Sequence, residues 1–315
     1  MNTFWSKNIF GIDALKTIRD FRFNTRFSEL YLQVLPIQRG MKLLDLGCGP
    51  GSFTRCIYDW FQGDLHVEGL DLDNGYIDFC TEIAARDHYN IAYTVGDACK
   101  TIFSNESFDI TTSYTVAQHV ENSAFLKEQY RILKHGGYIV IMDVGGYNEN
   151  IVSQLEVIPI SREEFNILVA LRIVDEQNNI IKAERHNKHK NSDHMTMNLL
   201  NDMGFTNILH QKIKIFGSPD NPQSDDFSRL IINNFYSQYI DLAISILNAD
   251  NSDDIKHIAN LYIDLVNERK AKRIEMYENN IKLWDSIETD VNIIIAKKGK
   301  LPVDMRLDYM EAKQR

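Results

Sequence analysis

Apolar and polar positions follow a regular pattern between residues 25 and 145. In the segment 25–35 the apolar side chains recur three and four positions apart, which predicts a helix that ends at Pro36. Further along, short apolar runs predict strands, and amphipathic stretches between them predict helices. The predicted strands are 41–46, 66–70, 91–95, 108–113 and 138–143, and the predicted helices are 52–61, 76–87 and 123–133. Strands that alternate with helices predict βαβ crossovers and a mostly parallel sheet.

The pattern is less regular after residue 145. Amphipathic spacing predicts helices, and two apolar runs predict strands. The predicted helices are 163–172, 195–203, 227–247 and 255–284, and the predicted strands are 205–216 and 291–296. The N-terminal arm, 1–24, is apolar without a clear period, and the tail, 300–315, is polar. The second half is therefore predicted to be mainly helical.

Composition and charge narrow the class of protein. The 315 residues include 34 basic and 44 acidic side chains, which gives a net charge of −10. This acidic balance argues against bulk nucleic-acid binding, which needs a basic footprint. No apolar run approaches the roughly 20 residues that span a bilayer, and the first residues lack the apolar core of a signal peptide. We therefore expect a globular cytoplasmic protein with no membrane and no nucleic-acid partner.

A glycine-rich loop carries the most specific signal in the chain. It runs from Asp45 to Gly51 as DLGCGPG, after a predicted strand and before a predicted helix. Glycines let the backbone turn tightly and approach a ligand, which then lies at the carboxyl ends of the strands. A dinucleotide fingerprint would need its third glycine at position 52, where this chain has Ser52, and no Walker lysine follows.

Beyond this loop, the chain resembles the class I S-adenosylmethionine-dependent methyltransferases in four further segments. An acid, Asp71, ends the second predicted strand, and an acid–small pair, Asp97-Ala98, follows the third. The segments 108–122 and 131–142 resemble the fourth strand with its turn and the RxLKPGG segment before the fifth strand. Five signatures in the expected order and spacing are strong evidence, whereas a lone GxGxG would be weak.

The resemblance implies an α/β fold. This fold is a three-layer αβα sandwich with a seven-stranded, mostly parallel sheet and an antiparallel last strand. On this interpretation residues 1–299 form one methyltransferase domain. Its core is 25–145, 193–216 and 290–299, and the helical insertions 146–192 and 217–289 form a substrate cap.

The resemblance also implies a cofactor, S-adenosyl-L-methionine, with S-adenosyl-L-homocysteine as the product. In this family the acid at Asp71 binds the ribose hydroxyls and the acid at Asp97 accepts from the adenine amine, while Leu72 is placed to pack on the adenine. Asp45 is expected to orient the loop or to hold the cofactor's amino group through water. The residues expected to bind the cofactor are Asp45, Gly47, Cys48, Gly49, Gly51, Asp71, Leu72, Asp97, Ala98, Ser113, Tyr114 and Gln118.

The acceptor is expected to be a small molecule that takes the methyl group on O or N by in-line displacement. His119, just after the fourth strand, is the candidate base, although a histidine there can instead pack or cap a helix. Candidate acceptor contacts are aromatic, and helix packing is the alternative role for each: Phe4, Trp5, Tyr147, Tyr236 and Tyr239.

The spacing of the histidines and cysteines does not favour a metal site or a disulfide. His186, His189 and His194 match no common metal site, and the four cysteines form no CxxC pair, so we expect no metal and no disulfide. Two alternative functions stay open at this point. One is a non-catalytic cofactor-binding module that regulates a partner, and the other is a methyltransferase for protein or RNA. A homodimer is compatible with the sequence.

Overall fold

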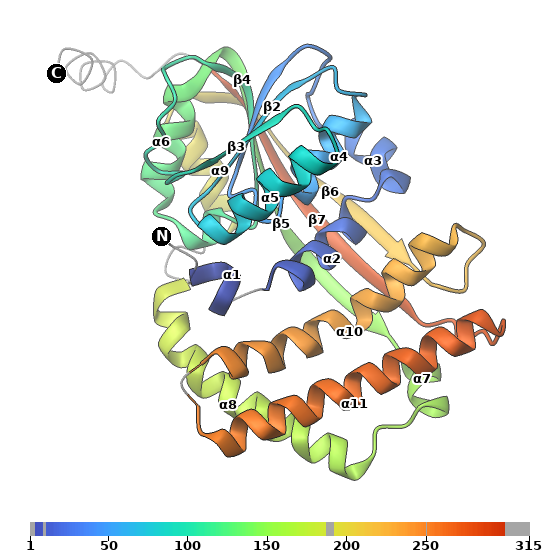
Figure 1. Cartoon of the computed structure of the whole chain (residues 1–315). Helices are drawn as coiled ribbons and strands as arrows, with labels where there is room; N and C mark the ends of the chain where they lie inside the picture. Colours follow the sequence, from blue (N-terminus) through green and yellow to red (C-terminus); the bar gives the residue numbers. More distant parts are fainter. Residues whose placement is uncertain (1–3, 9–10, 187–191, 250, 300–315) are drawn as a thin grey trace. The chain divides into compact units, whose positions relative to one another are not determined.

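A seven-stranded sheet organises the computed structural model, which describes residues 4–8, 11–186, 192–249 and 251–299 (Figure 1). The strand order is β3-β2-β1-β4-β5-β7-β6. The strands are β1 Lys42–Leu46, β2 His66–Asp71, β3 Ile91–Val95, β4 Phe108–Tyr114, β5 Leu133–Asn150, β6 Phe205–Gly217 and β7 Ser286–Lys298. All seven predicted strands are confirmed, and β5 and β7 extend well beyond their predicted ends.

The strands β1 to β5 are parallel in each of their four pairings. β7 runs the opposite way between β5 and β6. The Thr289 hydroxyl donates to the Gly146 carbonyl at 3.0 Å and Lys298 Nζ donates to the Leu133 carbonyl at 2.7 Å, so numbering rises along β7 as it falls along β5. The predicted fold class, mostly parallel with an antiparallel last strand, is confirmed.

Helices connect the parallel strands, as the alternation predicts. They are α4 Ser52–Trp60, α5 Asn74–Arg86 and α6 Asn122–Ile132, with α9 Asp193–Asp202 before β6. The Asp73 carboxylate caps α5 by accepting from the N–H groups of Gly75 and Tyr76, and Glu121 caps α6 in the same way. The helix predicted over 25–35 is wrong in its length. A 3-10 turn, η1 Thr25–Phe27, is followed by the five-residue helix α3 Ser28–Leu32.

Contacts divide the chain into two compact units. Unit 2 comprises 28–144, 186–213 and 291–315 and holds a core of fully buried side chains that includes Leu44, Phe108, Phe125 and Ile294. Unit 1 comprises 1–27, 145–185 and 214–290. The boundary falls inside β5, β6 and β7, so each of these strands contributes residues to both units.

Unit 1 is mainly helical, as the hydrophobic pattern predicts for the part after residue 145, whereas α1 and α2 lie in the N-terminal arm, where no helix is predicted. Its helices are α1 Phe4–Asn8, α2 Ile12–Arg22, α7 Val152–Val157, α8 Arg162–His186, α10 Asp225–Asn248 and α11 Asp253–Glu278. α10 and α11 lie side by side, and α2 packs on α10 (Figure 1). The rings of Phe21 and Phe227 stack between α2 and α10 with their centroids 6.0 Å apart. None of the helices in the described ranges is long and apolar enough to cross a membrane.

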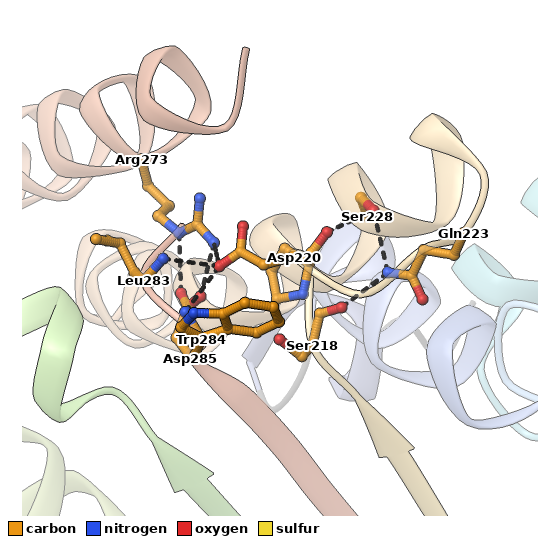
Figure 2. A network of polar contacts seen from close by, with 9 residues as sticks. Ser218, Asp220, Gln223, Ser228, Arg273, Leu283, Trp284 and Asp285 are labelled. Carbon is orange, nitrogen blue, oxygen red and sulfur yellow. Dashed lines mark hydrogen bonds and ion pairs between the residues drawn. The ribbon is translucent and has the colours of Figure 1, made fainter. Parts of the chain in front are cut away.

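A buried ionic network joins three segments of unit 1 (Figure 2). Arg273 on α11 donates to both carboxylate oxygens of Asp285, at 3.0 and 2.6 Å, and to Asp220 Oδ2 at 3.0 Å. Asp220 Oδ2 also accepts from the backbone N–H groups of Leu283 and Trp284. Burial lowers the pKa of the Arg273 guanidinium, but the two aspartates outweigh it and the net shift is upward. Since a buried charge is tolerated only when it is paired and hydrogen-bonded, this network fixes the start of β7 against α11.

Candidate functional site

The glycine loop between β1 and α4 has a left-handed backbone that residues with a Cβ atom rarely adopt. Gly47, Gly49 and Gly51 have φ of +67°, +55° and +72°. A Cβ at Gly47 would lie 2.3 Å from Val116 Cγ2, and one at Gly51 would lie 2.8 Å from Arg55 Nη1. The left-handed backbone and these close contacts together explain why the sequence has glycine here.

Asp71 links this loop to the end of β2. Its Oδ2 accepts the N–H of Gly49 at 2.8 Å, and its Oδ1 accepts the N–H of Asp73 at 2.9 Å. A carboxylate offers about four lone-pair positions, so an acid at this place can bind a ligand as well as hold the loop. The loop and the acid, which the sequence predicts to share one site, are in direct contact.

Asp45 is a buried acid at the end of β1 that connects the elements around the loop. It is only 2% exposed, and its carboxylate accepts from the hydroxyls of Thr54 at 2.6 Å and Thr112 at 3.1 Å. These bonds connect the end of β1 to α4 and β4. Asp45 thus orients the elements around the loop.

Cys48 points its side chain away from the open edge of the sheet. It is 1% exposed, and its thiol and that of Cys80 both lie against the Gly49 carbonyl oxygen, at 3.7 and 3.2 Å. Burial, followed by the hydrogen bond with Cys80, raises the pKa of the Cys48 thiol. The side chain of Cys48 therefore stays a neutral thiol beneath the loop, which leaves its backbone as the part that a ligand could meet.

The next polar group along the carboxyl edge is Asp97, after β3. Its side chain is exposed, and its Oδ1 accepts the N–H of Cys99 at 2.8 Å. Gly96 N–H donates to the Asp71 carbonyl at 2.9 Å, which joins the ends of β2 and β3. Leu72 is 47% exposed, whereas Ala98 is buried. An exposed carboxylate and an exposed apolar side chain thus lie at the carboxyl ends of the neighbouring strands β2 and β3, on one side of the point between β1 and β4 where the strand order reverses.

The end of β4, where two cofactor contacts are predicted, is largely buried. Ser113 and Tyr114 are almost fully buried, so their side chains are part of the core. Gln118 and His119 lie in the half-buried 3-10 turn η2 Ala117–His119, where their Nε2 atoms are 3.0 Å apart. Gln118 also lines a cavity within unit 2, of about 440 Å³ with its open mouth included. The other polar lining residues are Asn122, Asp143, Asp193, Thr196 and Asn292.

Residues 44–141, which contain the loop, both acids and the β4 turn, match the family model described as a methyltransferase domain. This segment is a methyltransferase domain. The signatures in the sequence identify the same family, and that identification is confirmed.

Relatives of known activity match the chain over part of its length. The demethylmenaquinone methyltransferase of Listeria monocytogenes serotype 4a is 24% identical over 138 residues, which cover 43% of this chain and 58% of the relative. Phosphoethanolamine N-methyltransferase 3 of Arabidopsis thaliana is 30% identical over 114 residues, which cover 36% of this chain and 23% of the relative. The chain thus spans less than two thirds of the length of these relatives.

Solved structures share the fold over most of the chain. Phosphoethanolamine N-methyltransferase 2 of Haemonchus contortus, in complex with S-adenosyl-L-methionine, superposes with a TM-score of 0.54 at 16% identity. The match covers 94% of this chain and 59% of that one. At this identity the similarity concerns the fold of the methyltransferase domain and its surroundings.

A second cavity, of about 510 Å³ with its open mouth included, lies within unit 1. It brings together Tyr236 and Tyr239, both predicted acceptor contacts, with Tyr262 and Glu149. Tyr147 donates a hydrogen bond to Glu149. Trp5 lies in α1, away from this cavity's lining, and the side chain of Phe4 is outside the described part of the structure. The predicted aromatic set is therefore only partly brought together.

Sequence reasoning missed Glu149 and Tyr262. Glu149 lies on β5 beyond the predicted end of that strand, and the signal that could have found it is the two-residue spacing of Tyr147 and Glu149, which places both on one face of a strand. Tyr262 is one of many aromatic residues on the predicted helices. Its importance depends on packing that a single sequence does not show.

The histidine-rich segment gives no metal site in the described residues. His189 is outside them, and so is the side chain of His186, while His194 Nδ1 lies 3.3 Å from Asn198 Nδ2. Across the described ranges, no group of three or more histidine, cysteine, aspartate or glutamate side chains could hold a metal ion.

Proposed function

We propose that this chain is an S-adenosylmethionine-dependent methyltransferase that acts on O or N of a small-molecule acceptor. The observation that carries the proposal is the 2.8 Å hydrogen bond between Gly49 and Asp71, since it brings the glycine loop and the first acid together within a methyltransferase domain. The acidic net charge of −10 disfavours nucleic acid as the acceptor.

The residues at the carboxyl edge fit the cofactor. We assign Asp71 to the ribose hydroxyls, Asp97 to the adenine amine and the exposed Leu72 to one face of the adenine. The left-handed backbone of Gly47–Gly51 supports this, because it makes a tight turn with no side chain at the carboxyl ends of the strands, where such a ligand lies. When bound, this cofactor supplies a methyl group on a positively charged sulfonium, which is already activated for transfer.

The remaining tasks of the protein are alignment of the acceptor, exclusion of water and acceptance of a proton. We assign the proton to Nε2 of His119 on η2; because an amide nitrogen only donates, this Nε2 is the unprotonated nitrogen, and it would exchange its hydrogen bond from Gln118 for the acceptor's proton. We assign acceptor binding to the cavity of unit 1, because two of the predicted contacts, Tyr236 and Tyr239, line it. In this proposal residues 1–299 work as one methyltransferase domain, and the helical segments 146–192 and 217–289 serve as its substrate cap.

Calorimetry with the purified chain tests the cofactor assignment. We expect S-adenosylmethionine and S-adenosylhomocysteine to bind, and Asp97→Asn to weaken both about tenfold, because the amide loses a charge-assisted hydrogen bond. Lys100→Met, a change of an exposed neighbour, is the control. Failure of the wild-type chain to bind either compound would overturn the proposal.

Labelled methyl transfer then tests the reaction. The chain is incubated with methyl-labelled S-adenosylmethionine and, separately, with small metabolites, total RNA and total protein. We expect label in the small-molecule fraction. Cofactor binding with no transfer to any fraction would favour a regulatory module instead.

A further inference from the structure

The cavity of unit 1 is mostly apolar and has one carboxylate in its wall. Aliphatic side chains from α7, α8, α11 and the segments that flank α7, with the ring of Phe235, form most of the lining, and the phenols of Tyr236, Tyr239 and Tyr262 add aromatic surface. The apolar lining residues are Ile151, Leu155, Ile160, Leu168, Phe235 and Val266. Such a lining suits a ligand with an apolar body.

The charges in the lining are unbalanced. Arg269 is paired with Glu164, its Nε lying 3.3 Å from Glu164 Oε1, and its Nη1 also donates to the Pro159 carbonyl at 3.2 Å. The other charged lining residue, Glu149, accepts from the Tyr147 hydroxyl but has no cationic partner among the residues that the structure describes. The lining therefore carries one negative charge that the protein leaves unpaired.

The hydrogen-bonding groups in the lining point to the same kind of ligand. Tyr236 is 4% exposed, and its hydroxyl is buried with no hydrogen-bond partner in the described ranges. Glu149 is half-buried, and burial raises the pKa of its carboxyl, with the Tyr147 hydrogen bond opposing this. A buried polar group without a partner is costly, so a ligand that satisfies both groups would stabilise this cavity.

We propose that this cavity binds a small organic ammonium ion with an apolar or aromatic body. An ammonium group has three donors and no acceptor, which matches a carboxylate and phenol oxygens, and the faces of tyrosine rings attract cations. The inference rests on the proposed function only in that this ligand would be the methyl acceptor. Binding of the amine itself does not depend on the cofactor.

Two arginines lie near the cavity, and their positions decide whether an amine or a phosphate group would fit it better. Arg172, which is exposed, lies close enough to Tyr239 and Tyr262 to lower their pKa values, and Arg22 acts on Tyr147 in the same way, although burial has the larger effect and raises all three. Neither arginine lines the cavity. A phosphate-bearing ligand would therefore have to reach Arg172 outside it, while an amine meets Glu149 within it.

The test compares ligands of one shape and different charge on the full chain. The probes are 2-phenylethylamine, 2-phenylethanol and 3-phenylpropionate, with phosphoethanolamine as the anionic amine, and binding is measured by calorimetry at neutral pH. We expect the amine to bind about tenfold or more tightly than the alcohol, the value of a charge-assisted hydrogen bond, and the propionate to bind least. Equal binding of amine and alcohol, or tighter binding of phosphoethanolamine, would overturn the inference.

Two variants locate the site. Glu149→Gln should remove the preference for amine over alcohol, whereas Glu156→Gln, the same change at an exposed position of α7, should keep it. Leu168→Trp, which fills the cavity from α8, should weaken amine and alcohol alike. A preference that survives Glu149→Gln would overturn the inference.

Calorimetry with S-adenosylmethionine on the same samples separates the two proposals. If the chain binds the amine but not the cofactor, the proposed function fails and this inference stands. If it binds the cofactor but shows no preference for the amine, this inference fails and the proposed function stands.

Discussion

The backbone N–H of Gly49 donates to Asp71 Oδ2 over 2.8 Å, so the acid that ends β2 also holds the glycine loop in place. Asp71 accepts a second N–H from Asp73. One carboxylate thus shapes both turns that border the proposed cofactor site. A change at Asp71 should for this reason alter binding and local stability together.

Asp71→Asn should weaken S-adenosylmethionine binding about tenfold to a hundredfold, because an amide can accept one of the two N–H bonds but turns a donor toward the other. The melting temperature should fall as well. Calorimetry and thermal unfolding measure the two effects, and Glu82→Gln on the exposed side of α5 is the control. Unchanged affinity would remove Asp71 from the site.

Gly47→Ala separates backbone strain from steric clash. The φ of +67° should cost about 1 kcal/mol of unfolding free energy, and the contact of 2.3 Å with Val116 should add about 1–3 kcal/mol. Gly40→Ala is a matched control, because its φ is +77° and a Cβ there meets nothing within 4 Å. Urea unfolding gives both values, and Val116→Ala should restore part of the loss. Equal losses at Gly47 and Gly40 would contradict the clash.

Arg273→Met should destabilise unit 1 by about 3–5 kcal/mol, since it leaves two buried carboxylates, Asp220 and Asp285, without their cation. Lys272→Met makes the same change at an exposed neighbour and should have little effect. Urea unfolding, followed by the fluorescence of Trp284, measures the difference. Similar stability of the two variants would show that the network contributes nothing.

Cys99 should react slowly with iodoacetamide. Burial and the carboxylate of Asp97 raise the pKa of its thiol to about 11, so it stays protonated at pH 8. Below that pKa the rate should rise with pH. At pH 8 the small thiolate fraction lowers the rate, and the greater nucleophilicity of a more basic thiolate offsets part of this loss, so the rate should be about tenfold below that of a free cysteine peptide. Peptide mass spectrometry gives the rate at this residue. Asp97→Asn should speed it, and a rate equal to the peptide's would contradict the expectation.

His119→Ala should lower kcat about tenfold or more while the affinity for S-adenosylmethionine stays the same, because the proposed role concerns the acceptor's proton. His135→Ala, at an exposed position of β5, is the control. Steady-state kinetics and calorimetry give the two quantities. An unchanged kcat would leave His119 with a packing role.

The sequence predicts the sheet well because its strands carry local signals. Short apolar runs separated by amphipathic stretches predict all seven strands, and the resemblance to the methyltransferase family implies the direction of the last one. The prediction of β5 ended too early because Gly145 and Gly146 follow it, and a glycine pair normally marks a strand end. In the structure the strand continues to Asn150. The helix predicted over 163–172 is too short, because alanine, glutamate, lysine and arginine after residue 180 are good helix formers and α8 extends to His186.

The two candidate sites differ in how far sequence reasoning reaches them. The proposed cofactor residues follow strand ends in order, and the resemblance to the methyltransferase family implies that Gly49 and Asp71 share one site. The cavity of unit 1 combines side chains from β5, α7, α8, α10 and α11, which are more than a hundred residues apart at their extremes. Its charge balance depends on which partner Arg269 takes, and only the packed structure shows that partner to be Glu164.

Gly49 has both of its backbone groups engaged, the N–H by Asp71 and the carbonyl by the thiols of Cys48 and Cys80. A loop held in this way already has its bound shape before a ligand binds, so little conformational entropy of the loop is lost on binding. A nucleoside should therefore bind to this preorganised loop at a small entropic cost.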